Sequence, residues 1–234
     1  MQLSINRWFN KDKEHAQYFA LDDHLEVRFV NDIDRSKYSV IKSFRDKMLK
    51  VSFIICVNKK LNNIGNDSVS KFHEKFKSVK INHVPMLKSQ LQKCIRRQYK
   101  SRAIKTGFNL LFSDQHQFLR RLLIIMLEDV YLHESFILII WLMCAVPHWN
   151  LSIIQGKYLL GIIGYLCDCE KMDKVKTEYN KNKYIEIMNE KIFKVFGKEK
   201  DMLYSLHIRS INGGLKGDVK MCRYFVNKLS LIHI

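Results

Sequence analysis

The apolar run FILIIWLMCAV, residues 136–146, constrains the fold more than any other segment of this sequence. It carries no charged side chain, so a helix formed by it must be buried on every face. The run is too short to cross a bilayer, and His133, Glu134 and Pro147 flank it. We therefore expect a central helix that ends at Pro147 and is packed among other helices. An interfacial membrane segment is the minor alternative.

Proline and glycine are scarce, with 2 and 9 residues in a chain of 234. This scarcity favours long helices with short connections over a turn-rich β-fold. The length allows one or two domains, and an apolar fraction of 47% is enough for a core. From residue 85 onward we expect about eight helices, which pack as an irregular multi-helix bundle over residues 85–228.

Residues 1–84 predict a small α+β module, so the expected fold is mainly α with this module in front. Residues 24–30 (HLEVRFV) alternate in polarity, and residues 50–57 (KVSFIICV) are rich in β-branched side chains, as strands are. Between them, SVIKSFRDKMLK has helical spacing of its apolar residues, which predicts a helix over residues 39–50. A short amphipathic helix is predicted over residues 68–79.

Apolar stripes and capping residues define the expected helices. The first two stripes are Leu87, Leu91, Cys94 and Ile95, then Ile104, Phe108, Leu111 and Phe112. Asp114 is an expected N-cap, with Gln117 placed as in a capping box. Gly197 is expected to cap the C-terminus of a helix over residues 184–197. Glycines at 156, 161 and 164 should permit close helix packing.

The last residues, LSLIHI (229–234), resemble the translated start of a common sequencing-adaptor read. We therefore expect the natural chain to be truncated here, with no structural meaning after Lys228.

The formal net charge of +17 and a pI near 9.6 favour an anionic partner. Nucleic acid comes first, and an acidic membrane surface or an acidic protein second. An AT-rich genome, which inflates lysine, asparagine and isoleucine, is the alternative cause of the charge.

The basic residues concentrate between residues 86 and 127, where nine Lys and Arg residues face one acid, Asp114, for a local charge of +8. Aromatic residues interleave with them, as in many nucleic-acid-binding segments. A solvated basic face is an equally weighted alternative. The candidate nucleic-acid-binding residues are Lys93, Arg96, Arg97, Lys100, Arg102 and Lys105.

The stretch FLRRLLIIMLEDV, residues 118–130, places charges at both ends of an apolar helix. Arg121 and Glu128 share a stripe but lie about 10 Å apart, so they cannot pair. We expect structural ion pairs instead, because a buried helix tolerates little unpaired charge. Arg96 and Arg97 are the expected partners of Glu128 and Asp129, while Arg120 and Arg121 would meet acids elsewhere. A phosphate bound by Arg120 or Arg121 is the functional alternative.

No motif predicts a metal, a cofactor or a catalytic residue. The CDC motif at 167–169 lacks a second ligand pair, and the histidines show no metal-binding spacing. Residues 211–218, INGGLKGD, resemble a phosphate loop only in their glycines, so a turn in which Asp218 caps the last helix is expected. The 6 cysteines fit no secreted disulfide framework, and no signal peptide is evident. We expect a cytoplasmic or nuclear protein.

The segments LKSQLQKCIRR and AIKTGFNLLFSDQHQFLRRLLIIMLEDV resemble two groups of proteins. One is a set of uncharacterised helical proteins of large DNA viruses and microbial eukaryotes, which GGLKGD also resembles. The other, more distant, is the helical C-terminal region of clamp-loader-like AAA+ ATPases of the Werner-helicase-interacting family. The matching positions are Lys88, Ser89, Lys93, Ile95, Arg96, Arg120, Arg121, Leu122, Ile124, Glu128, Asp129 and Val130.

The resemblance covers about a fifth of the chain and implies association with DNA replication or repair, with DNA a better partner than RNA. Walker A, Walker B and sensor-arginine motifs are missing, so it implies no ATP hydrolysis. Our first hypothesis is a non-enzymatic helical protein that binds nucleic acid or joins a replication–repair assembly. The alternatives are a structural interaction module and a metal-dependent nucleic-acid enzyme that uses Glu128, Asp129 and Glu134.

Overall fold

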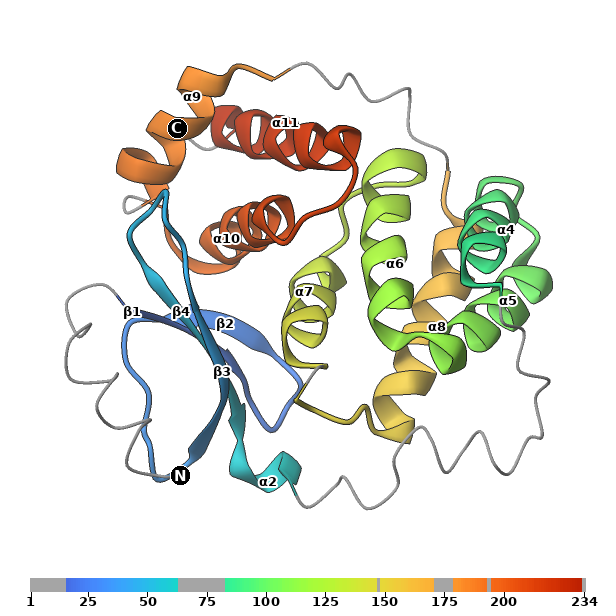
Figure 1. Ribbon diagram of the computed structural model, residues 1–234, viewed down its shortest axis with the longest axis horizontal. Helices are drawn as coiled ribbons and strands as arrows, with labels where there is room; N and C mark the ends of the chain where they lie inside the picture. The colour runs from blue at the N-terminus through green and yellow to red at the C-terminus, as the bar shows by residue number, and fades with distance from the viewer. Residues whose placement is uncertain (1–15, 63–82, 147, 171–178, 193–194, 233–234) are drawn as a thin grey trace.

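The computed structural model describes residues 16–62, 83–146, 148–170, 179–192 and 195–232. A four-stranded sheet lies at one side of the molecule, and helices fill the rest (Figure 1). The mainly helical architecture behind a small N-terminal α+β module is confirmed.

The sheet has the strand order β2-β1-β4-β3, so β1 (Ala16–Leu21) and β4 (Ser52–Asn58) are its central strands. These two strands run parallel, while β2 (Val27–Val30) and β3 (Tyr38–Arg45) pair antiparallel at the edges. β2 and β4 fall where the sequence predicts strands. A four-residue helix, α2 (Lys59–Asn62), follows β4.

The predicted helix over residues 39–50 is wrong, because this segment forms most of β3 and the turn after it. The register shifts between Val40 and Lys42, which leaves Ile41 as an extra residue. Such a bulge breaks the two-residue alternation of a strand. The apolar residues then fall at spacings that imitate a helix. The helix predicted over residues 68–79 lies outside the described residues.

Eight α-helices follow from residue 84 onward in the described part of the chain, as predicted. A π-helical turn, η3 (Ile187–Lys191), continues α9. The helices are α4 (Val84–Arg96), α5 (Lys100–Ser113), α6 (Gln115–Asp129), α7 (Ser135–Ala145), α8 (Ile153–Asp168), α9 (Lys181–Glu186), α10 (Gly197–Ile211) and α11 (Lys216–Ile232).

The predicted stripe of α4 is buried in full, but α5 turns a different face to the core. Its buried residues centre on Gly107, while Ile104, Phe108 and Phe112 are only partly buried. A Cβ at Gly107 would lie 2.2 Å from Cδ1 of Ile163 on α8. The absence of a side chain at this position therefore sets how closely α5 and α8 approach.

Helix ends agree with the sequence only in part. Asp114 caps α6 by accepting from the Gln117 N–H at 2.9 Å, but the Gln117 side chain bonds to Lys88 and closes no capping box. A complete capping box joins Ser152 and Gln155 at the start of α8. Gly197 begins α10 instead of ending the helix before it.

The C-terminal end differs from expectation in two ways. Asp218 lies inside the first turn of α11, which begins at Lys216, and does not precede that helix as a cap. Residues 229–232 continue α11, and Ser230 is buried with its hydroxyl on the Asn227 carbonyl. The adaptor origin of residues 229–234 stays a prediction.

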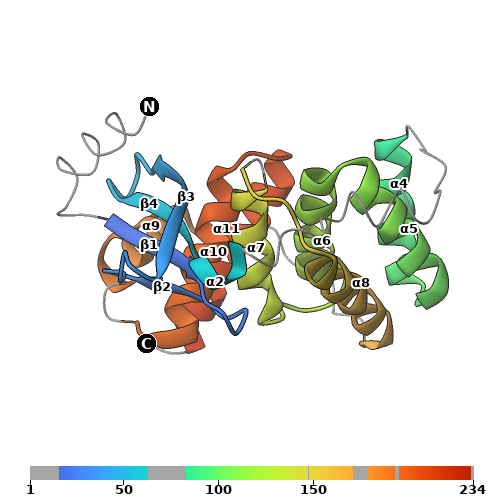
Figure 2. The same cartoon turned by 90° about the horizontal axis from the view of Figure 1, so that it is seen from below.

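Helix α7 is the centre of the fold, as its sequence predicts. It lies between the sheet and helices α4, α5, α6 and α8 (Figure 2), and its residues are almost all buried. The Trp141 indole N–H donates to the carbonyls of Phe19 on β1 and Cys56 on β4, at 3.0 and 3.1 Å. No helix in the described part of the chain is long and apolar enough to cross a membrane.

One continuous core joins the sheet to the helices. The rings of Phe29 and Phe53 pack against Tyr204 of α10, with centroids 5.0 and 5.6 Å away. Asp201 of α10 accepts from the Phe29 N–H at 2.9 Å. A division of the chain near residue 84 stays a prediction about its organisation.

Replacing Trp141 by Phe should lower the free energy of unfolding by about 1–3 kcal/mol, because two buried carbonyls lose a shared donor. Trp149 is the matched control, since its ring contacts Trp141 while its own N–H has no partner among the described residues. Trp149→Phe should lower the free energy of unfolding by at least about 1 kcal/mol less than Trp141→Phe does. Urea denaturation measures both, and equal losses would show that the hydrogen bond contributes nothing.

Candidate nucleic-acid interface

Helices α4 and α5 meet at a tight turn that exposes basic side chains. The Tyr99 N–H bonds to the Cys94 carbonyl at 2.8 Å and the Gln98 N–H to Ile95 at 2.9 Å, the pair of bonds of a Schellman motif. Gln98 takes the left-handed conformation, φ 59°, that glycine usually supplies there. The tight reversal leaves every residue from Arg96 to Arg102 exposed.

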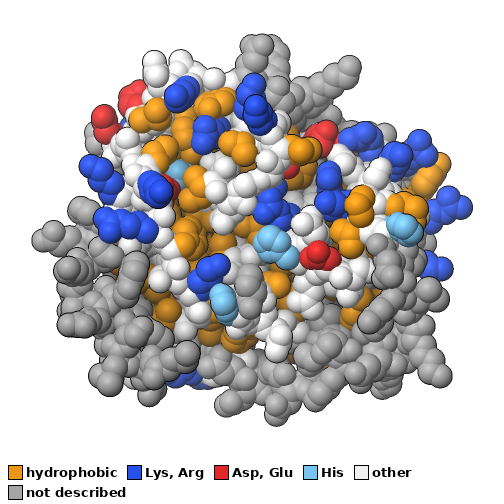
Figure 3. Space-filling view, viewed as in Figure 1, with side chains coloured by type: hydrophobic (Ala, Val, Ile, Leu, Met, Phe, Trp, Pro, Cys, Tyr) orange, Lys and Arg blue, Asp and Glu red, His pale blue; other side chains and the backbone are white. Residues whose placement is uncertain are grey.

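Part of the predicted basic set gathers at this turn. Lys93, Arg97, Tyr99 and Arg102 line one hollow of about 430 Å³, which we call the α4–α5 corner. The Arg102 guanidinium lies 5.9 Å from the Tyr99 ring centroid. Figure 3 shows Lys and Arg side chains gathered at the edge of the molecule formed by these helices. Lys105 is exposed further along α5.

Arg96 faces the other way and joins a polar network between α4 and α6. Its Nε and Nη2 each lie 2.7 Å from Oδ1 of Asp129, and Glu128 is 3.9 Å away. The Gln92 amide donates to both carboxylates, at 2.7 and 2.8 Å. Asp129 is 5% exposed and Arg96 49%, so the arginine neutralises a buried charge. Arg96 is therefore a structural residue.

Lys100 is also held by an acid. Its ammonium pairs with Asp168 at the end of α8, and the Gln98 amide donates to the Cys169 carbonyl beside it. In contrast, Lys93, Arg97 and Lys105 have no carboxylate within ion-pair distance among the described residues. The predicted set therefore divides into two cations that are paired with acids, Arg96 and Lys100, and a group without such a partner among the described residues.

Arg120 and Arg121 bind neutral oxygens where the sequence predicted acids. Arg120 donates to the Asn212 carbonyl at 2.9 Å, and Arg121 to the Gln92 amide oxygen at 3.1 Å. Gln92 thus links Arg121 to the carboxylates that Arg96 neutralises. The expected partnership of Arg97 with Glu128 or Asp129 is not formed, because Arg97 lines the hollow.

A buried polar chain between the sheet and the helices escaped the sequence analysis. Asp46, in the turn after β3, bonds to His207 Nε2, and His207 Nδ1 bonds to the Tyr184 hydroxyl at 2.6 Å. That hydroxyl lies 3.2 Å from the Ser210 hydroxyl. Asp46 and His207 are 161 positions apart, so no local spacing could reveal the contact.

The hydrogen-bonded network of Asp46, His207, Tyr184 and Ser210 has a structural role. Its members are 0–4% exposed, so their side chains are almost completely closed to solvent. Burial raises the pKa of Asp46, but the hydrogen bond and charge of His207 and two backbone N–H groups outweigh it. The net effect lowers the pKa of Asp46 below its ordinary value, which stabilises the ionised form.

The described residues contain no group of three His, Cys, Asp or Glu side chains placed to hold a metal ion. All six cysteines are unpaired. Burial raises the pKa of the Cys144 and Cys222 thiols to about 12, so these thiols are unreactive at neutral pH. In the CDC motif, Cys167 is buried and its pKa is raised to about 11, chiefly by burial.

No protein-family model, no curated protein and no solved structure matches this chain. The resemblance to viral proteins and to clamp-loader-like ATPases stays a prediction from the quoted motifs.

Arg96→Met should lower the free energy of unfolding by about 2–4 kcal/mol, because it leaves the Asp129 carboxylate buried without a cation. The neighbouring Arg97→Met removes an equal charge from an exposed site and should change stability by less than about 0.5 kcal/mol. Thermal or urea denaturation distinguishes them. Equal stabilities would contradict the structural role of Arg96.

Asp46→Asn should lower the free energy of unfolding by about 1–3 kcal/mol at pH 7, since it removes a charged hydrogen bond. The folded-state pKa of Asp46 is lowered, so this stability is present above the unfolded-state pKa of about 4 and is lost as pH falls through the folded-state value. In urea denaturation, the difference in the free energy of unfolding between the two proteins should shrink as the pH falls from 7 to 3. A constant difference would contradict the ionised state.

Proposed function

We propose that this protein binds nucleic acid through the α4–α5 corner. The observation that carries the proposal is the convergence of Lys93, Arg97 and Arg102 on one exposed hollow, with no neutralising carboxylate among the described residues. Cationic side chains placed in this way make phosphate contacts that release counterions. Tyr99, 49% exposed in the same hollow, offers a ring on which an unstacked base can stack.

DNA is the preferred partner in this proposal, within an assembly that replicates or repairs it. That part rests on the resemblance of the α4 and α6 segments to the clamp-loader-like family. Arg96, Glu128 and Asp129 of the shared motif hold α4 against α6. Most of the charged motif residues therefore stabilise the packing of the helix that carries the corner. Lys93 is the one cationic motif residue that lines the hollow.

The two alternative functions have weaker support. The acids proposed for a metal-dependent enzyme are engaged separately, because Glu128 and Asp129 bind Arg96 and Gln92 while Glu134 pairs with Lys198. In a structural interaction module the apolar helix α7 would complete a partner's core, but α7 is covered by its own chain. A binding protein without catalysis agrees best with these contacts.

The test is the salt dependence of binding to a fluorescent DNA oligonucleotide, followed by anisotropy. The variant Lys93→Gln/Arg97→Gln/Arg102→Gln should bind more weakly at low salt. The slope of log K against log salt should fall by about 2–3, since each lost contact with duplex DNA removes about 0.9. An RNA oligonucleotide of the same sequence measures the preference for DNA.

The matched control removes three exposed lysines from α9 and α11, which lie away from α4 and α5 in Figures 1 and 2: Lys181→Gln/Lys220→Gln/Lys228→Gln. It carries the same net charge as the corner variant. If the slope falls equally in both variants, binding depends on net charge and not on the α4–α5 corner. If the unmodified protein does not bind DNA, the proposal is wrong.

A further inference from the structure

A second cavity opens at the centre of the face shown in Figure 3, between β3, α6, α7 and the loop that joins α10 to α11. We call it the central cavity, and its volume is about 490 Å³. Ligand sites for small molecules span about 300–1,000 Å³. Its lining includes Lys42, Phe44, His116, Met143, Cys144 and Asn212.

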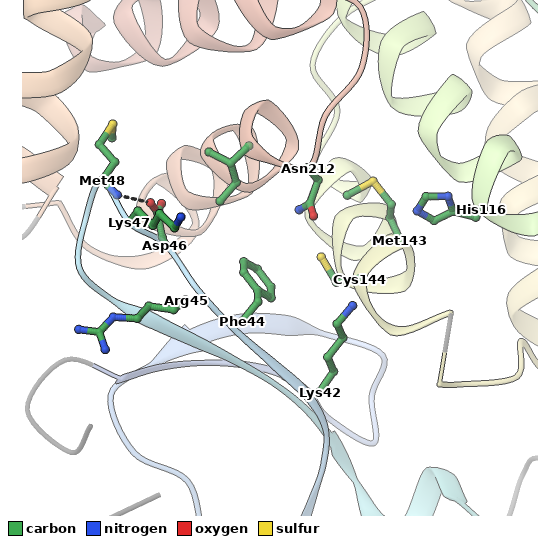
Figure 4. Close-up of a pocket in the computed structure, with 11 residues that line it drawn as sticks. Lys42, Phe44, Arg45, Asp46, Lys47, Met48, His116, Met143, Cys144 and Asn212 are labelled. Atoms are coloured by element: carbon green, nitrogen blue, oxygen red, sulfur yellow. Dashed lines mark hydrogen bonds between the residues drawn. The ribbon is translucent and has the colours of Figure 1, made fainter. Parts of the chain in front are cut away.

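Positive charge surrounds the cavity. Figure 4 shows the Lys42 ammonium reaching toward it from β3 and the His116 ring facing it from α6. Burial lowers the pKa of His116, and the charge of Arg120 lowers it further, against the opposing charge of Asp114. Lys42 adds to the lowering. An anion between Lys42 and His116 would be stabilised by the charges of Lys42 and Arg120, while the neutral His116 ring could donate a hydrogen bond to it.

Two arginines stand behind the loop that carries Asn212. A Cβ at Gly214 would lie 3.4 Å from Nη1 of Arg209 and 3.5 Å from Nη2 of Arg120, so both guanidinium groups flank this glycine. Gly214 has φ 129°, which a side chain would strain. Arg209 is 1% exposed, and its Nε has no hydrogen-bond partner among the described residues. One acid, Asp218, lies 3.6 Å from Arg209.

The cavity wall holds one acid, Asp46, among three cations, Lys42, Arg45 and Lys47. Asp46 bonds through one carboxylate oxygen to His207 and through the other to the Met48 and Leu49 N–H groups. Its hydrogen-bonding capacity is taken up inside the protein. Of the basic lining side chains, Arg45 points away from the cavity in Figure 4, while Lys42 and His116 face it and can meet an anion.

The rest of the lining is suited to a flat apolar group. In Figure 4 Phe44 of β3 lies on one side of the space, and Met143 and Cys144 of α7 lie on the other. The side-chain amide of Asn212 points into the cavity. An N–H of its Nδ2 donates a hydrogen bond to the Ile208 carbonyl at 2.9 Å. Its Oδ1 can therefore accept a hydrogen bond from a ligand N–H.

We propose that the central cavity binds a small molecule in which a phosphate is joined to a flat nitrogenous ring, such as a nucleoside monophosphate. The phosphate lies between Lys42 and His116. The ring packs on Phe44 and Met143 and donates an N–H to Asn212 Oδ1. This site is separate from the α4–α5 corner, and the two ligands bind independently.

Isothermal titration calorimetry of the full chain tests the proposal, with the four common ribonucleoside monophosphates, inorganic phosphate and adenosine as separate probes. At least one monophosphate should bind with a Kd below about 1 mM. Inorganic phosphate and adenosine should each bind about tenfold more weakly, since each makes only part of the contacts. An equal affinity for inorganic phosphate would overturn the assignment to a nucleotide, and no binding of any monophosphate would overturn the site.

Two variants locate the binding. Lys42→Met should lower the affinity for the monophosphate about tenfold. Asn212→Ala should lower the affinity for the monophosphate but not that for inorganic phosphate. Lys157→Met, which removes an exposed charge of α8 outside the cavity, is the control and should bind the monophosphate as the unmodified protein does. Binding unchanged in both Lys42→Met and Asn212→Ala would overturn the proposal.

The triple variant of the α4–α5 corner should keep its affinity for the monophosphate. If the unmodified protein binds the monophosphate but not DNA, only the proposal for the corner fails. If it binds DNA but not the monophosphate, only the proposal for the central cavity fails. Loss of monophosphate binding in that variant would show that the corner and not the central cavity holds it.

Discussion

The indole N–H of Trp141 is the contact on which the architecture depends. It binds carbonyls of both central strands, β1 and β4, from the middle of the most apolar helix. A hydrophobic helix could slide over a sheet, because apolar contact has no direction. A hydrogen bond fixes one position of α7 against the parallel pair. The helices that pack on α7 are then placed relative to the sheet.

A second layer of polar contacts makes this arrangement specific. Asp46, His207 and Tyr184 join the end of β3 to α10 and α9, and Asp201 caps a strand N–H from α10. Each pair connects elements far apart in sequence. Buried polar groups require partners, so a displaced helix would leave several unsatisfied at once. The sheet and the helical bundle are therefore held together by more than shared apolar area.

The basic charge of the chain is divided between structure and surface. Arg96 and Lys100 are anchored by acids of α6 and α8, Arg120 supports the loop after α10, and Lys93, Arg97 and Arg102 are left to solvent. The proposed DNA contact and the proposed nucleotide cavity use different members of this charge. Behind the corner Arg96 binds the Asp129 carboxylate, and behind the cavity Arg120 binds the Asn212 carbonyl.

The sequence by itself determined the helical class, the central place of residues 136–146 and the buried stripe of α4, because these follow from periodicity within one element. It also predicted a basic footprint within one segment, and the role of that footprint in binding stays a prediction. Tertiary structure alone decided that residues 39–50 form an edge strand, that Arg96 is anchored while Arg97 is free, and that Asp46 meets His207. Those outcomes depend on partners distant in the chain, and local spacing holds no information about which partner a side chain will meet.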